Sequence, residues 1–169
     1  MCCGGCWGHG RAVDSCGLTV IRLLQQVWRE DEMNEPAAVR EILGMKTIAV
    51  VGMSADPGKA SHYVSAYMQR HGFRILPVNP ALAAAGAEVL GERSYASLAA
   101  LPVKPDVVNV FRPPQAIGAI VDEMLALGLK NLWVQQGIVN REAAERAEQG
   151  GIRVVMDRCI MVEHRKNSD

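Results

Sequence analysis

Short apolar runs recur along this chain, and segments with helical spacing separate them. Five runs have the length and composition of strands buried on both faces: Thr47–Val51, Arg74–Val78, Asp106–Val110, Asn131–Val134 and Ile152–Met156. Parallel strands covered by helices on both sides have this composition, because neither of their faces meets water.

Between these runs the apolar positions follow a helical period. The sequence predicts four helices after the first strand: Ser61–His71, Pro113–Leu127, Asn140–Gln149 and Cys159–Lys166. The alternation predicts an α/β fold, a Rossmann-like three-layer arrangement with a mainly parallel five-stranded sheet and right-handed crossovers. The longest connection, Ala81–Leu101, is expected to contain a short edge strand at Glu88–Leu90 and a helical turn capped by Ser97.

Residues 1–32 do not share this alternation. Their first half is rich in glycine and aperiodic, whereas Leu18–Glu30 has apolar residues at helical spacing. We interpret residues 1–32 as an N-terminal extension, either a disordered tail or a loosely docked helix. Residues 33–169 are then the domain proper, and Met33 is a natural place for the chain to start.

Composition narrows the classes of partner. The 169 residues have a formal net charge of zero and no basic stripe, so the sequence does not predict nucleic-acid binding. No apolar run approaches the roughly 20 residues that a membrane helix needs. We expect a monomer or a homodimer.

Cysteine usage favours the reducing cytoplasm. Of five cysteines, four lie within the first sixteen residues and only Cys159 lies in the domain, which does not suit a disulfide framework. A zinc site built from Cys3, Cys6, His9 and Cys16 is conceivable, but no second well-spaced cysteine pair follows Cys3 and Cys6. No metal site is therefore predicted.

The segment Lys46–Ser61 combines a buried strand, a glycine turn and the start of a helix. Backbone N–H groups and the positive end of a helix dipole meet at such a turn and favour a phosphate group. Candidate ligands are Ser54, Lys59 and Ser61 with the backbone at Gly52 and Met53. The alternative is a plain strand–helix connection whose polar residues only cap the helix.

Two familiar phosphate motifs do not fit this turn. Ser54 replaces the second glycine of the dinucleotide pattern Gly-x-Gly-x-x-Gly. Five residues, and not four, separate Gly52 from Gly58, and Ala60 follows Lys59 where a P-loop has its magnesium ligand. The turn therefore supports neither ordinary NAD binding nor magnesium–nucleotide chemistry.

Ligands of open parallel sheets bind beyond the carboxyl ends of the strands. The residues that follow the second, third and fourth predicted strands are Asn79, Pro80, Phe111, Arg112, Gln135, Gln136 and Gly137. Asn79 stands where a NAD site usually has an acid, and an amide does not repel a phosphorylated ribose. With Lys59 and Arg112 nearby, this edge favours CoA or NADP. Otherwise Asn79-Pro80 is a simple turn and Arg112 a solvated cation.

Candidate catalytic residues are few. Cys159 follows the fifth predicted strand and is either a reactive thiol or a small core residue. His164 lies five residues further on, which does not clearly put the two side chains on one helix face. We therefore assign no catalytic residue.

A set of motifs in fixed order resembles a known family. The chain contains Thr-Ile-Ala-Val-Val-Gly-Met-Ser, Val-Asn-Pro, Asp-Val-Val-Asn-Val-Phe-Arg, Trp-Val-Gln-Gln-Gly-Ile-Val-Asn and Val-Met-Asp-Arg-Cys-Ile between Pro36 and Arg165. It resembles the small CoA-binding proteins of bacteria, which are similar to the CoA-binding domain of the succinyl-CoA synthetase α subunit.

This resemblance implies a role for each strand end. Gly52, Met53, Ser54, Lys59 and Ser61 would surround the phosphates of CoA. The nucleotide pocket would be lined by Asn79, Pro80, Val110, Phe111 and Arg112, and the pantetheine side by Gln135, Gln136 and Gly137. Ligase activity is not implied, because a phosphohistidine domain and a nucleotide-binding subunit have no counterpart in these 169 residues.

The expected function is binding of coenzyme A or an acyl-CoA as a carrier or sensor, without catalysis. Two alternatives remain open: an NAD(P)(H)-binding protein, and a thiol-redox protein that acts through Cys159.

Overall fold

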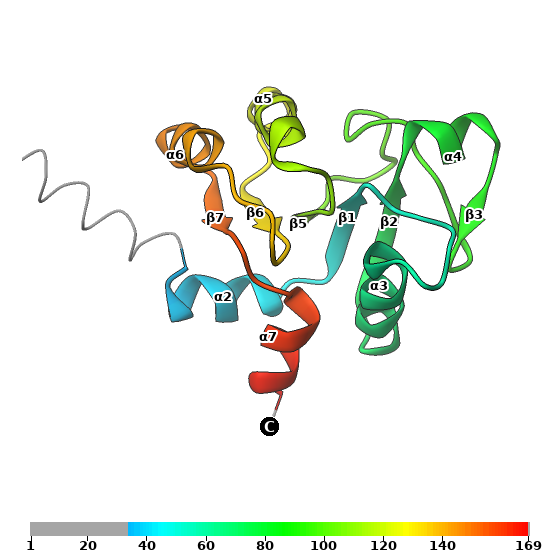
Figure 1. The fold of residues 1–169 in the computed structure, drawn as a ribbon, viewed down its shortest axis with the longest axis horizontal. Helices are drawn as coiled ribbons and strands as arrows, with labels where there is room; N and C mark the ends of the chain where they lie inside the picture. The colour runs from blue at the N-terminus through cyan, green and yellow to red at the C-terminus, as the bar shows by residue number, and fades with distance from the viewer. Residues whose placement is uncertain (1–33, 169) are drawn as a thin grey trace, which may run out of the picture. The chain divides into compact units, whose positions relative to one another are not determined.

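A parallel sheet of five strands forms the centre of the computed structural model, which describes residues 34–168 (Figure 1). The strands lie in the order β2-β1-β5-β6-β7. Their bounds are Thr47–Val51 for β1, Arg74–Val78 for β2, Val107–Val110 for β5, Asn131–Val134 for β6 and Arg153–Val155 for β7. All neighbouring pairs are parallel, which confirms the predicted fold class.

Helices cover both faces of this sheet. One face packs against α2 (Pro36–Leu43), α3 (Ala60–Arg70) and α7 (Ile160–Lys166), and the other against α5 (Ile117–Ala126) and α6 (Arg141–Gln149) (Figure 1). A 3₁₀ turn, η1 (Pro114–Ala116), precedes α5, and the short helix α4 (Pro80–Ala84) follows β2.

The two faces of the sheet carry separate apolar clusters because side chains alternate along each strand. In β1, Ile48 and Val50 face α2, α3 and α7, whereas Ala49 faces α5 and α6. Trp133 of β6 is fully buried on the first face, and its indole N–H donates to the Arg158 carbonyl at 2.7 Å. Burial on both faces explains why the strands read as nearly continuous apolar runs.

Most predicted boundaries agree with the structure within one or two residues. Asp106 is an instructive exception, since it lies just before β5. Its carboxylate accepts from the Thr47 N–H at 2.9 Å and its own N–H donates to the Thr47 carbonyl at 2.9 Å. Asp106 therefore connects the start of β1 to the start of β5. These hydrogen bonds explain why a polar residue precedes the apolar residues of β5.

The connection after β2 differs from the prediction in three places. Asn79-Pro80 starts α4, because Asn79 Oδ1 accepts from the Ala81 N–H at 2.9 Å as an N-cap. The expected edge strand pairs instead with its own neighbour, as β3 (Glu88–Val89) and β4 (Glu92–Arg93) form a separate antiparallel hairpin. Ser97 lies in a series of turns and starts no helix.

The interpretation of residues 1–32 lies outside the described residues. Within residues 34–168, no helix is both long enough and apolar enough to cross a membrane.

An aromatic and cationic cluster joins α7 to the end of α3. His164 Nδ1 lies 3.1 Å from the Tyr67 hydroxyl, and the ring centroids of His164 and His71 are 5.1 Å apart. Phe73 packs edge-on against His164 at 5.4 Å, and the Lys46 ammonium lies 5.7 Å from the Phe73 ring centroid. Burial lowers the pKa of His164 below its ordinary value of 6.5, and the charges of His71 and Lys46 lower it further.

This lowered pKa predicts acid sensitivity of the fold. Below about pH 6.5 the unfolded chain takes up a proton at His164 more readily than the folded chain, so stability should decrease as pH falls through the lowered pKa of His164. Thermal unfolding followed from about pH 7.5 to about pH 5 should show this loss. His164→Gln should flatten the profile and the control His62→Gln should not. An unchanged slope in His164→Gln would mean that other groups cause the acid sensitivity.

Candidate functional site

The strand order reverses between β1 and β5, and the candidate site lies at that point. The chain leaves β1 for β2 on one side and returns to β5 on the other. The ladders continue past the strands, since the Gly52 N–H donates to the Val78 carbonyl at 3.0 Å and the Phe111 N–H to the Val51 carbonyl at 2.9 Å. The loops after β1, β2 and β5 are thereby held together around Gly52. Parallel α/β sheets bind ligands at such a position.

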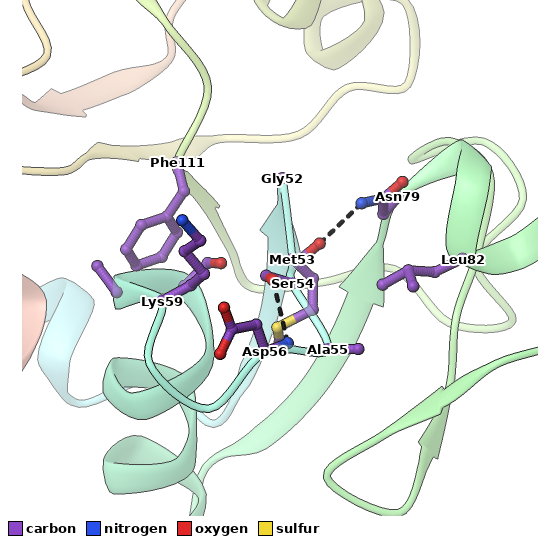
Figure 2. A pocket seen from close by; sticks show the side chains of 11 residues that line it. Gly52, Met53, Ser54, Ala55, Asp56, Lys59, Asn79, Leu82 and Phe111 are labelled. Carbon is purple, nitrogen blue, oxygen red and sulfur yellow. Dashed lines mark hydrogen bonds between the residues drawn. The ribbon is translucent and has the colours of Figure 1, made fainter.

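A cavity of about 560 Å³ with several polar lining residues opens on the α3 side of this point (Figure 2). Figure 2 shows Phe111 and Lys59 at one side of it and Asn79 and Leu82 at the other. It brings together seven of the residues predicted for the site: Gly52, Met53, Ser54, Lys59, Ser61, Asn79 and Phe111. The Met53 side chain is itself buried in the core, so the backbone of Met53 is what the cavity uses.

The loop between β1 and α3 is shaped by its own polar residues. Ser54 Oγ accepts from the Asp56 N–H at 3.1 Å, and Asp56 Oδ1 accepts from the Gly58 N–H at 2.8 Å. Asp56 also lines the cavity and brings a negative charge to it, which the sequence prediction missed. The available signal was the turn chemistry of Asp56-Pro57-Gly58, because aspartate commonly accepts from the N–H two residues later.

The first turn of α3 lies at the cavity. Lys59 occupies the N-cap position without a capping hydrogen bond from its side chain. Ala60 and Ser61 begin the helix and line the cavity. The first N–H groups of any helix need partners from outside it, and an anion satisfies them well. Lys59 adds a positive charge at the same place.

Asn79 connects two of these loops through its side chain. Its Oδ1 caps α4, while its Nδ2 donates to the Met53 carbonyl at 2.8 Å. An aspartate at this position could still cap the helix but could not donate to Met53. Asn79 therefore holds the loop after β1 in place in addition to lining the cavity.

A second cavity, of about 460 Å³, lies on the α5 side of the same point. It shares Gly52 and Asn79 with the first cavity and contains the predicted residues Pro80 and Arg112. Besides residues of β1, β2 and α4, its remaining lining comes from the 96–98 turn and from the η1–α5 segment, and it is mostly apolar apart from Ser97 and Glu123. These two segments were not predicted for the site, since no charged or glycine-rich motif marks them.

Arg112 lies directly over Gly52. A Cβ added to Gly52 would meet the Arg112 Cδ at 3.0 Å and the Phe111 carbonyl oxygen at 3.1 Å, and Gly52 has a φ of +91°. A side chain at position 52 would therefore be strained and would push against Arg112. Glycine permits this close approach of Arg112 and the Phe111 carbonyl at a position that both cavities share.

The other predicted site residues have different positions. Val110 is fully buried in the core cluster on the α5 face, so its side chain lines neither cavity. Gln135 is also buried, and its Nε2 donates to Asn109 Oδ1 at 2.8 Å across β5 and β6. The Gly137 N–H donates to Asp157 Oδ1 at 2.7 Å, and Gln136 lines a third cavity near β7. Cys159 is partly buried, is not in a disulfide and also lines that third cavity.

The geometry combines a loop and helix start that carry Lys59 with a mostly apolar second cavity. The described residues contain no group of three or more histidine, cysteine or acidic side chains arranged to hold a metal ion. A molecule with both phosphates and an apolar or aromatic part matches the two connected cavities.

A comparison with protein families agrees with this chemistry. A family model described as "CoA binding domain" matches residues 46–165. This match extends from the start of β1 to the last turn of α7 and includes every residue that lines the first two cavities.

Individual relatives differ in their sequence identity to this chain and in how much of their length it covers. An "Uncharacterized protein YneT" of Bacillus subtilis is 41% identical over 129 residues, which are 76% of this chain and 93% of that protein. A solved structure from Thermus thermophilus, "cell-free ID.343", is 43% identical, with a TM-score of 0.72 over 76% of this chain and 95% of that one. The ADP-forming acetate–CoA ligase I of Archaeoglobus fulgidus is 24% identical over 68% of this chain, which spans only 18% of the ligase.

The tight contacts at Gly52 predict that a side chain at this position lowers the stability of the fold by more than backbone strain alone would. Gly52→Ala should destabilise the fold by about 2 kcal/mol or more, because it combines a positive φ with a collision against the Phe111 carbonyl. Gly72→Ala is the matched control, since Gly72 has a φ of +87° but open space around its Cβ position. It should cost about 1–2 kcal/mol. Urea unfolding of both variants tests the difference, and equal losses would contradict the proposed contact.

Proposed function

Because the chain belongs to the family of CoA-binding domains, we propose that it binds coenzyme A or an acyl-CoA along the carboxyl edge of its sheet. The proposed role is that of a carrier or sensor without catalysis of its own. The observation that carries this proposal is the pair of cavities that share Gly52 and Asn79, one lined by Lys59 and the start of α3 and the other mostly apolar with Arg112 in its lining. CoA has a matching division into phosphates and a nucleotide base.

The diphosphate of CoA is assigned to the first cavity. The N–H groups at the start of α3 and the Lys59 ammonium supply donors and positive charge there. Asp56 opposes this charge in part, so the bound phosphates must lie nearer to Lys59 and α3 than to the Asp56 carboxylate.

The adenosine part is assigned to the second cavity. Small side chains on α5 and in the 96–98 turn leave room for a planar base, and Arg112 lines the same cavity beside Gly52. A ribose phosphate near Arg112 would gain a charge-assisted hydrogen bond. Neutral Asn79 favours the same phosphate, because a carboxylate at that position would repel it.

Competing functions use the same edge of the sheet. NADP(H) also carries a ribose phosphate and an adenine, so it is the nearest alternative among nucleotides. The acetate–CoA ligase supports CoA as the ligand, but it is a much longer protein and its activity is not part of the proposal. A reducing cytoplasm is the proposed location, consistent with the unpaired thiol of Cys159.

Calorimetry with CoA, dephospho-CoA, NADH and NADPH tests the assignment. CoA should bind at micromolar concentration or tighter. Dephospho-CoA should bind more weakly by about 1.5–3 kcal/mol, because it lacks the phosphate assigned to Arg112. Tighter binding of NADH or NADPH than of CoA would show that the assignment is wrong.

Substitution of Asn79 separates its charge effect from its structural role. Asn79→Asp introduces a negative charge and removes the donor to Met53, whereas Asn79→Ser removes that donor without a charge. We expect the Asp variant to lose more affinity for CoA than for dephospho-CoA, and more than the Ser variant loses. Binding of NADH should be affected less by Asn79→Asp than binding of CoA.

Calorimetry and thermal unfolding of both Asn79 variants provide the measurement. If both variants lose the same affinity for both CoA forms, Asn79 acts only through its contact with Met53 and does not discriminate the ribose phosphate.

A further inference from the structure

The third cavity, of about 410 Å³, lies at the carboxyl ends of β6 and β7 and has no part in the assignments above. Its lining comes from Asn34 ahead of α2, the loop after β6, the segment after β7 and α7. The polar lining residues that matter here are Gln136, Asp157, Arg158, Cys159, Glu163 and Lys166.

This cavity lies on the same edge and the same face of the sheet as the first cavity. Phe111, which lines the first cavity, and Cys159, which lines the third, both pack against the apolar cluster between the sheet and α2, α3 and α7. The ends of β1 and β7 are three strand positions apart, at about 4.8 Å each. A ligand with phosphates at α3 and a long extended arm would pass Phe111 and reach the third cavity.

Both acids of the third cavity already have partners within the protein. Asp157, in the left-handed region with a φ of +59°, accepts from the Gly137 N–H at 2.7 Å. The Glu163 side chain is only 11% exposed and lies 3.0 Å from Lys166 Nζ and 3.5 Å from Arg158 Nη1. Glu163 is thus held inside, where it orients both cations, whereas the Asp157 side chain is exposed.

Both cations reach solvent in the third cavity, as do the side chains of Gln136 and Asp157. The side chains of Arg158 and Lys166 are 39% and 62% exposed. The pair with Glu163 involves one nitrogen of Arg158, whose guanidinium has five N–H groups in a planar fork. A second carboxylate can therefore be bound without displacing Glu163.

We propose that the third cavity receives the acyl group of a CoA thioester and selects a short acyl group that ends in a carboxylate. This inference rests on the proposed function, since it places the thiol end of CoA beyond Phe111. A long alkyl chain is disfavoured, because it would cover charged groups without replacing their hydrogen bonds to water. A terminal carboxylate instead makes charge-assisted hydrogen bonds with Arg158 and Lys166.

Malonyl-CoA and propionyl-CoA are a matched pair of probes, because a carboxylate in one replaces a methyl group in the other. We expect malonyl-CoA to bind roughly tenfold tighter than propionyl-CoA, the difference that one charge-assisted contact supplies. Octanoyl-CoA should bind no tighter than propionyl-CoA. Calorimetry on the full chain measures all three with free CoA as the reference.

Arg158→Gln should abolish most of the malonyl preference while free CoA binds as before. Lys104→Gln is the matched control, since it removes one exposed positive charge ahead of β5, at the opposite edge of the sheet. Unchanged affinity for free CoA and unchanged thermal unfolding verify that Arg158→Gln folds, and Lys166→Gln provides a second variant if it does not.

Equal binding of malonyl-CoA and propionyl-CoA, tighter binding of octanoyl-CoA, or a malonyl preference that survives both substitutions would overturn the inference. Any of these results with free CoA still bound would leave the proposed function intact. Failure of the wild-type chain to bind free CoA would instead overturn the proposed function itself.

Discussion

The parallel pairing of β1 with β2 on one side and β5 on the other is the constraint on which the candidate site depends. Because β1 lies between the strand that follows it and the strand that comes later, the loops after all three meet at one point. Hydrogen bonds from the Gly52 and Phe111 N–H groups extend both pairings one residue beyond the strands. A change of strand order would separate Asn79 from Arg112 and remove the site.

The site at the end of β1 has a different chemical environment on each face of the sheet. On the α3 face, a loop and a helix start present backbone donors and Lys59. On the α5 face, small side chains leave a mostly apolar space. Gly52 lines both cavities, and its missing side chain lets Arg112 lie against the backbone. A single ligand can therefore place unlike chemical groups on opposite sides of one strand end.

Several site residues hold one another in position before any ligand arrives. Asn79 donates to the Met53 carbonyl and caps α4. Ser54 and Asp56 order the loop between β1 and α3 through their own hydrogen bonds. Such contacts reduce the ordering cost of binding, because the loop is already shaped. They also mean that substitutions at these residues change stability and affinity together, so each binding measurement needs a matched measurement of folding.

The sequence alone determined the α/β alternation, most strand boundaries and the residues at the strand ends, because these depend on local patterns of apolar residues and turns. Tertiary structure decided which side chains face the cavities. Gln135 follows a strand as predicted, yet it pairs with Asn109, 26 residues earlier, inside the sheet. Val110 faces the core, and the 96–98 turn and α5 contribute to the second cavity. Strand register and packing bring such distant residues together, and no local pattern encodes them.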